Sequence, residues 1–124
     1  MEKVTSPRIY VSKKVTNFDG MELLDYFKTN DENIVHSFKD SRDRIFFTSH
    51  KIVLVDFSGL IENRKQILCI PYKSIIGISI ESSGHFNSKS ELSLFVRDLG
   101  NIVVEMGKDI DVKAVSKFLN TKIL

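Results

Sequence analysis

The sequence is poor in residues that cross-link or interrupt a chain, with one cysteine, two prolines and no tryptophan among 124 residues. A single cysteine excludes an internal disulfide bond, which favours a protein of a reducing compartment. No apolar run approaches the roughly 18 residues of a membrane-spanning helix, and the first residues lack the apolar core of a secretory signal. We therefore expect a soluble, cytoplasmic protein.

An excess of either charge is also missing, because 18 basic residues face 16 acidic ones and the formal net charge is +2. This balance argues against a nucleic-acid partner. The first 14 residues are an exception, with Lys3, Arg8, Lys13 and Lys14 against Glu2. We expect a basic N-terminal arm over residues 1–16 and a single domain over residues 17–124. The arm is either a solvated terminus or a contact for anionic lipid or phosphate.

Motifs of enzymes are missing as well. The sequence has no Gly-x-Ser-x-Gly element and no phosphate-binding glycine loop. His36, His50 and His85 do not have the spacing of metal ligands. Cys69 lies in an apolar run, which predicts a thiol that packs as a small apolar side chain. We expect no catalytic residues, no metal and no cofactor, and we predict that the protein is not an enzyme.

What the sequence does contain, from residue 33 onwards, is a dense supply of β-branched and aromatic residues with regular interruptions. This pattern is typical of an antiparallel β domain. The predicted strands cover residues 33–39, 44–48, 51–57, 66–72, 75–82, 91–97 and 101–106. Only Ser49 and His50 separate the second and third predicted strands, so a tight hairpin turn can connect them. Gly100 lies in the short loop before the last strand, at a position that needs a positive φ.

Two stretches repeat apolar residues at helical spacing. One predicts a short helix over residues 21–29, and the other predicts a C-terminal helix with one apolar face from Val112 to Ile123. Asp109 or Asp111 can cap the second helix. The predicted fold class is therefore mainly β, a seven-stranded sandwich or partly open barrel with a C-terminal α-helix and a short N-terminal helix.

The hairpin over residues 44–57 is apolar on both faces, although a small antiparallel sheet needs only one apolar face. A two-residue turn sets its register, which pairs Phe47 with Ile52, Ile45 with Leu54, Phe46 with Val53, and Arg44 with Val55. Phe46, Val53 and Val55 then share the second face. Either the protein's own helices cover this face, or a second copy does. We predict the second copy, and hence a homo-oligomer with these three residues at its interface.

Basic residues near the first predicted strand pair suggest a second kind of site. Lys39, Arg42 and Arg44 surround the loop between these strands, and Lys51 lies near the far end of the next hairpin. Arg42 and Arg44 share a face and can fork around one phosphate. Two aspartates interrupt the same loop, so the alternative is an ion-paired, solvated turn.

Three stretches, in this order, resemble the bacterial pleckstrin-homology-like (PH-like) domain family. They read RDRIFFTSHKIVLVD at residues 42–56, IPYKSI at residues 70–75 and SIESSGHF at residues 79–86. The resemblance extends over about residues 32–124. It implies a bent, roughly orthogonal seven-stranded sandwich that the C-terminal helix closes at one end.

The resemblance also implies a function class. Members of the family look like stand-alone domains without enzymatic activity that assemble into rings of identical subunits. Eukaryotic relatives bind phosphoinositide headgroups near the positions of Lys39, Arg42 and Arg44, although a shared fold alone does not transfer function. Our leading hypothesis is a non-enzymatic interaction module that self-assembles. The alternative is a module that binds anions or the inner membrane surface through these three residues and Lys51.

Overall fold

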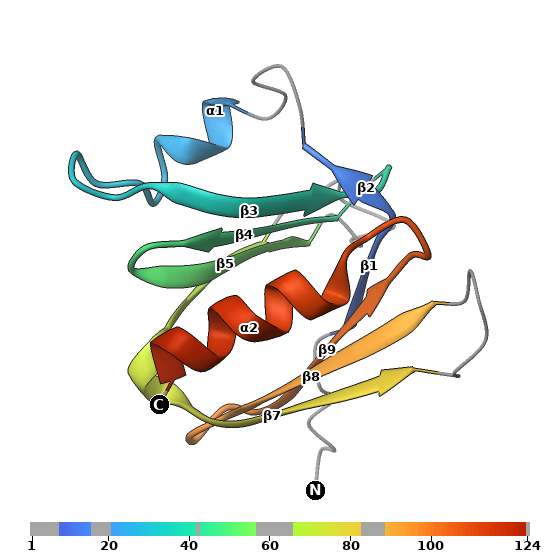
Figure 1. The fold of residues 1–124 in the computed structure, drawn as a ribbon. Helices are drawn as coiled ribbons and strands as arrows, with labels where there is room; N and C mark the ends of the chain where they lie inside the picture. Colours follow the sequence, from blue (N-terminus) through green and yellow to red (C-terminus); the bar gives the residue numbers. More distant parts are fainter. Residues whose placement is uncertain (1–7, 16–20, 42, 57–65, 83–88, 124) are drawn as a thin grey trace, which may run out of the picture.

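Two β-sheets pack against each other without closing into a barrel (Figure 1). The computed structural model describes residues 8–15, 21–41, 43–56, 66–82 and 89–123. The first sheet has the order β1-β9-β8-β7 and consists of β1 (Arg8–Val11), β7 (Ile75–Ser82), β8 (Ser90–Val96) and β9 (Gly100–Met106). The second sheet runs in chain order through β2 (Lys13–Lys14), β3 (Ile34–Lys39), β4 (Arg44–Thr48), β5 (Lys51–Asp56) and β6 (Gln66–Pro71).

The helical elements of the described residues are α1 (Met21–Leu24), the 3-10 helix η1 (Tyr72–Ser74) and α2 (Val112–Ile123). All seven predicted strands are present, with ends within one or two residues of the prediction. The mainly β fold with a C-terminal helix and a short N-terminal helix is therefore confirmed. The N-terminal helix is shorter than predicted, because regular helix ends at Leu24 and the chain continues as a turn.

The register of the β4–β5 hairpin is the predicted one, with Ile45 opposite Leu54 and Phe46 opposite Val53. The hydroxyl of Thr48 holds the turn, since its Oγ1 accepts hydrogen bonds from the backbone N–H groups of His50 (3.0 Å) and Lys51 (2.9 Å). Gly100 has a φ of 102°, as the sequence predicts.

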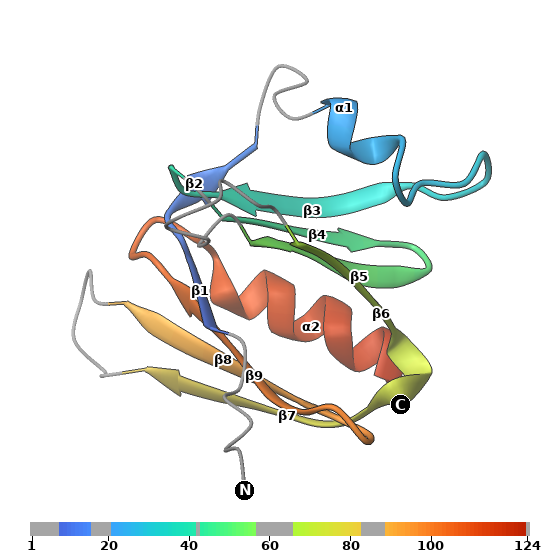
Figure 2. The ribbon, with the colours of Figure 1, turned by 180° about the vertical axis from the view of Figure 1, so that it is seen from behind.

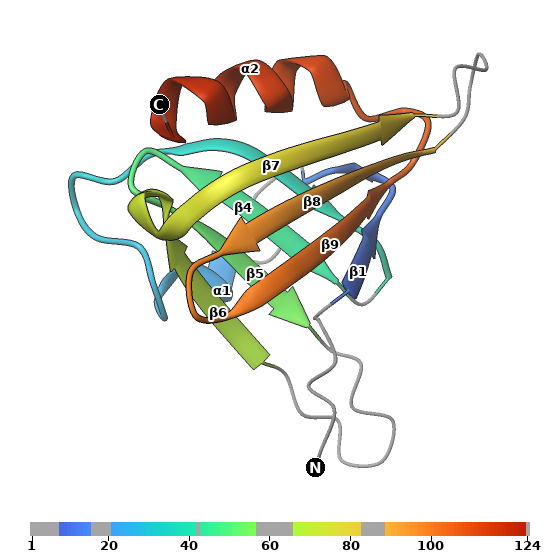
Figure 3. The same ribbon diagram turned by 90° about the horizontal axis from the view of Figure 1, so that it is seen from below.

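Helix α2 lies along the open side between the two sheets and beside β7 (Figure 3). Asp111 caps it, because its Oδ1 accepts a hydrogen bond from the backbone N–H of Ala114 at 3.1 Å. Val115 and Leu119 of the helix are completely buried. They join the inward side chains of both sheets in the main hydrophobic core.

A second, smaller core lies on the other face of the second sheet, beneath α1. There Leu23 and Phe27 cover Phe46, Val53 and Val55, whose exposed fractions are 3%, 0% and 0%. The rings of Phe27 and Phe46 lie 5.3 Å apart. This finding corrects our interface prediction. The second apolar face is covered by the protein's own residues 21–27, here called the α1 segment, so these three residues form no exposed surface for a second copy.

The segment from Arg8 to Lys14 contributes a strand to each sheet (Figure 2). β1 runs parallel to β9, and β2 runs antiparallel to β3. The chain crosses from one sheet to the other at Ser12, which passes close to Gly107. A Cβ atom on Gly107 would lie 3.1 Å from the Cα of Ser12, so any side chain here would force the crossing backbone to shift. The remainder of the predicted arm, residues 1–7 and 16, lies outside the described residues.

Candidate functional site

Three basic side chains stand in one row across the end of the second sheet. Lys13 of β2 lies opposite Lys39 of β3, and Lys39 lies opposite Arg44 of β4. Residues that face each other across antiparallel strands point to the same side of the sheet, with Cβ atoms about 5 Å apart. The strands therefore present Lys13, Lys39 and Arg44, here called the basic row, on one face. Lys13 is exposed, and Lys39 and Arg44 are half-buried.

The turn between β3 and β4 is fastened to the N-terminal segment. Its backbone closes with a 2.9 Å hydrogen bond from the N–H of Asp40 to the carbonyl oxygen of Asp43. The carboxylate of Asp40 accepts a hydrogen bond from the hydroxyl of Ser12 (3.0 Å), and that of Asp43 accepts one from the backbone N–H of Tyr10 (3.2 Å). The two aspartates that interrupt the basic loop in the sequence thus anchor the crossing between the sheets.

The structure brings together some of the predicted anion-binding residues and separates others. Lys39 and Arg44 are neighbours, whereas Arg42 lies outside the described residues. Lys13, which the sequence placed in the basic arm as a candidate contact for anionic lipid or phosphate, joins the row through the pairing of β2 with β3. That pairing was not predicted. A signal was present: the doublet Lys13-Lys14 closely follows the extended run at residues 8–11.

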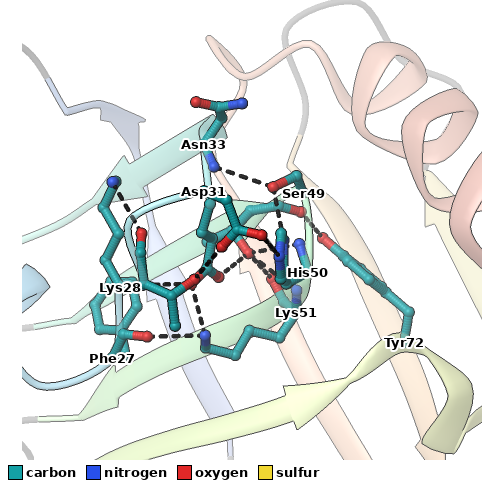
Figure 4. A network of polar contacts seen from close by, with 11 residues as sticks. Phe27, Lys28, Asp31, Asn33, Ser49, His50, Lys51 and Tyr72 are labelled. Carbon is teal, nitrogen blue, oxygen red and sulfur yellow. Dashed lines mark hydrogen bonds and ion pairs between the residues drawn. The ribbon is translucent and has the colours of Figure 1, made fainter.

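Lys51 does not belong to this site. Its Nζ atom lies 2.8 Å from Oε1 of Glu32 and donates a hydrogen bond to the carbonyl oxygen of Phe27, also at 2.8 Å (Figure 4). The hydroxyl of Thr48 donates to the other carboxylate oxygen of Glu32. Lys51 therefore holds the α1 segment onto the β4–β5 hairpin, which corrects its prediction as an anion ligand.

Glu32 is completely buried and yet ionised. Burial alone would raise the pKa of its carboxyl group, but hydrogen bonds from Lys51, Thr48 and the backbone of Thr29 outweigh burial and lower this pKa to about 2. These three hydrogen bonds compensate for the burial of the charge. Glu32 therefore has a structural role, and its ionised state does not require a bound ligand.

The described residues offer little for catalysis. They contain no group of three or more His, Cys, Asp or Glu side chains that could hold a metal ion. Cys69 is exposed on the edge strand β6, whereas the sequence predicted a packed apolar side chain. Partial burial of its sulfur still raises the pKa of the thiol, which disfavours the nucleophilic thiolate.

Large apolar side chains are exposed on the first sheet. Ile76 of β7 and Phe95 of β8 have exposed fractions of 64% and 39%, and Leu99 in the following turn has 42%. Phe95 lies opposite Gly77 on the neighbouring strand, and Gly77 directly follows Ile76 in the chain. These side chains lie on a different sheet from the face predicted for a second copy. Among the described residues, none of the helices has the length and apolar character of a membrane span.

The family model of the bacterial PH domain matches residues 7–123, which is nearly the whole chain. The chain belongs to the bacterial PH domain family. A further relative of this bacterial PH domain is the uncharacterized protein YjqA of Bacillus subtilis (strain 168), with 33% identity over 90 residues. The match covers 71% of this chain and 72% of the relative.

Solved structures support the same fold. A protein of the DUF1696 family with a pleckstrin-homology domain, from Shewanella loihica, superimposes with a TM-score of 0.77 at 24% identity, covering 90% of this chain and 97% of the other. A pleckstrin homology domain from Shewanella amazonensis gives a TM-score of 0.70 at 26% identity, covering 90% and 91%. A PH domain containing protein from Exiguobacterium sibiricum gives 0.70 at 20% identity, covering 92% and 62%.

Proposed function

We propose that this bacterial PH domain is a non-catalytic interaction module that binds a phosphate-bearing ligand along the basic row. The observation that carries this proposal is the register that sets Lys13, Lys39 and Arg44 side by side on one face. PH domains are generally non-catalytic modules, which supports the first part of the proposal.

The strand register holds the three positive charges of the basic row in fixed positions. Three cations side by side on one sheet face create a local positive potential that attracts an anion. Arg44 can bind two phosphate oxygens with its planar guanidinium, while a lysine acts as a point charge. Because the row lies across hydrogen-bonded strands, its geometry exists before the ligand arrives, which lowers the entropic cost of binding.

Co-sedimentation with vesicles tests this proposal. Wild-type protein should sediment with phosphatidylcholine vesicles that contain phosphatidylglycerol, less so at high salt, and not with phosphatidylcholine alone. The variant Lys13→Glu/Lys39→Glu should bind about tenfold more weakly or worse. NMR titration with inorganic phosphate separates the two sources of the anion, since a soluble ligand shifts the β2–β4 resonances without any membrane.

A matched control keeps the change in net charge but moves it elsewhere. Lys113 and Lys117 are exposed on α2, so Lys113→Glu/Lys117→Glu should retain binding. Equal losses in both double variants would show an effect of net charge and would contradict the role of the basic row. A wild-type protein that binds neither the vesicles nor phosphate would also contradict the role of the basic row.

Self-association is the second candidate, and the exposed apolar side chains of β7 and β8 favour it. Burial of Ile76, Phe95 and Leu99 against another copy would remove apolar area from water and stabilise a homo-oligomer, including a ring. We expect light scattering to give a mass above 14.2 kDa for the wild type and a monomer for Ile76→Asp. Tyr26→Asp, at another exposed apolar residue, should leave the oligomer intact, and a monomeric wild type would exclude this candidate.

A further inference from the structure

His36 lies between the second sheet and α2, among aromatic rings from three elements. It sits on the inner face of β3, opposite Phe47 of β4. Its imidazole is stacked on the ring of Phe38, with centroids 6.2 Å apart. It makes edge contacts with Phe47 at 6.5 Å and with Phe118 of α2 at 5.6 Å. The imidazole is thus part of the surface on which α2 packs.

The charged groups around this imidazole come from the neighbouring elements. Lys14 of β2 repels a proton on His36, and Asp111 at the start of α2 attracts one. Lys122 lies 5.8 Å from the centre of the Phe118 ring. Tyr72 of η1 also contacts Phe118, but its hydroxyl donates a 2.7 Å hydrogen bond to the carbonyl oxygen of Thr48.

Burial and Lys14 together outweigh Asp111 and lower the pKa of His36 below its ordinary value of 6.5. In the docked state, partial burial and the nearby Lys14, which lies opposite Phe38 on the same face of the sheet, therefore favour the neutral imidazole over the charged imidazolium. Lifting α2 away would remove Phe118 and expose the half-buried ring of His36 further to water. Protonation and the lifted state of α2 thus favour each other.

We propose that His36 makes the docking of α2 sensitive to pH, so that acidification through the physiological range loosens the helix from the second sheet. The docked state is favoured above pH 6.5 and loses its advantage as the pH falls towards the lowered pKa of the folded state. Within this window the opening equilibrium changes by up to about tenfold per pH unit.

Hydrogen exchange at controlled pH tests the proposal. We expect the protection of α2 amides to fall several-fold between pH 7.5 and 5.5, relative to that of the central strand β9 in the same sample. The NMR titration midpoint of His36 should lie below 6.5, its ordinary value. In His36→Gln, which keeps a polar side chain without titration, the ratio of α2 to β9 protection should no longer depend on pH.

His50 supplies the matched control. It is exposed at the β4–β5 turn, where its Nε2 lies 3.6 Å from a carboxylate oxygen of Asp31. The variant His50→Gln should keep the wild-type dependence of α2 protection on pH. The proposal is overturned if His36→Gln also keeps that dependence, if α2 and β9 lose protection in equal proportion, or if α2 protection stays constant while His36 titrates. His36→Phe provides a second non-titrating variant should His36→Gln fail to fold.

Discussion

Lys51 and Glu32 form a buried ion pair, with 2.8 Å between Nζ and Oε1 and side-chain exposed fractions of 18% and 0%. The pair joins the loop before β3 to the first residue of β5. It therefore fastens the segment that contains α1 to the sheet that this segment covers.

The two partners of this pair should respond differently to substitution. Lys51→Met leaves a charged carboxylate without its cation in a completely buried place, and we expect a loss of about 3 kcal/mol or more in the free energy of unfolding. Glu32→Gln should cost less, because the side chain of Lys51 is 18% exposed and its charge can turn towards water. Urea denaturation of both variants and of the double variant measures the coupling. Equal losses from the two single variants would contradict this asymmetry.

Acid should weaken the protein through Glu32. Its pKa falls from 4.5 to about 2 on folding, so the unfolded chain binds the proton more readily. The stabilisation by this carboxylate is complete above pH 4.5 and is lost as the pH falls towards 2. We expect the urea midpoint to decline across this window in the wild type. The decline should be shallower in Glu32→Gln, and parallel curves would show that other carboxyl groups are responsible.

Removal of the α1 cover should create the surface that the sequence suggested. Phe27→Ala deletes the ring that packs on Phe46, and we expect a loss of about 3 kcal/mol with the main core intact. The uncovered Phe46 and Val53 should then promote association, which light scattering detects as a mass that rises with concentration. Tyr26→Ala, at an exposed neighbour, should leave the mass independent of concentration. A stable, monomeric Phe27→Ala would show that α1 does not protect this face.

A side chain at position 107 should destabilise the protein, because Ser12 passes close to Gly107. Gly107→Ala places a methyl group 3.1 Å from the Cα of Ser12 and 3.3 Å from the hydroxyl oxygen of Tyr10. Such overpacking costs about 1–3 kcal/mol, and we expect faster hydrogen exchange in β1 and β2. Gly77→Ala is the control, since its new methyl would meet only Phe95 at an ordinary 3.8 Å. Similar exchange in both variants would argue against a tight crossing.

The sequence predicted the second sheet well and its cover less well. A two-residue turn fixes the β4–β5 register locally, so the pairing of Phe46 with Val53 followed directly from the sequence. The sequence of this hairpin also made both of its faces apolar. An apolar face does not show whether it packs against its own chain or against a second copy. The structure shows that Leu23 and Phe27 supply it.

The basic site was predicted only in part, for a related reason. Lys39 and Arg44 flank one short turn, so their proximity follows from the sequence alone. Lys13 reaches the row through a pairing with β3 that no short-range signal specifies. Lys51 looked equally basic in the sequence, and only its contact with Glu32, 19 residues earlier, removes it from the site.

The parallel pairing of β1 with β9 has a consequence for how the molecule is made. Arg8 lies beside Val103, so β1 pairs with a strand that is synthesised much later than β1 itself. Until then Ile9 and Val11, both buried in the finished core, have no partner strand. Such distant contacts slow folding and prolong the exposure of apolar side chains during synthesis.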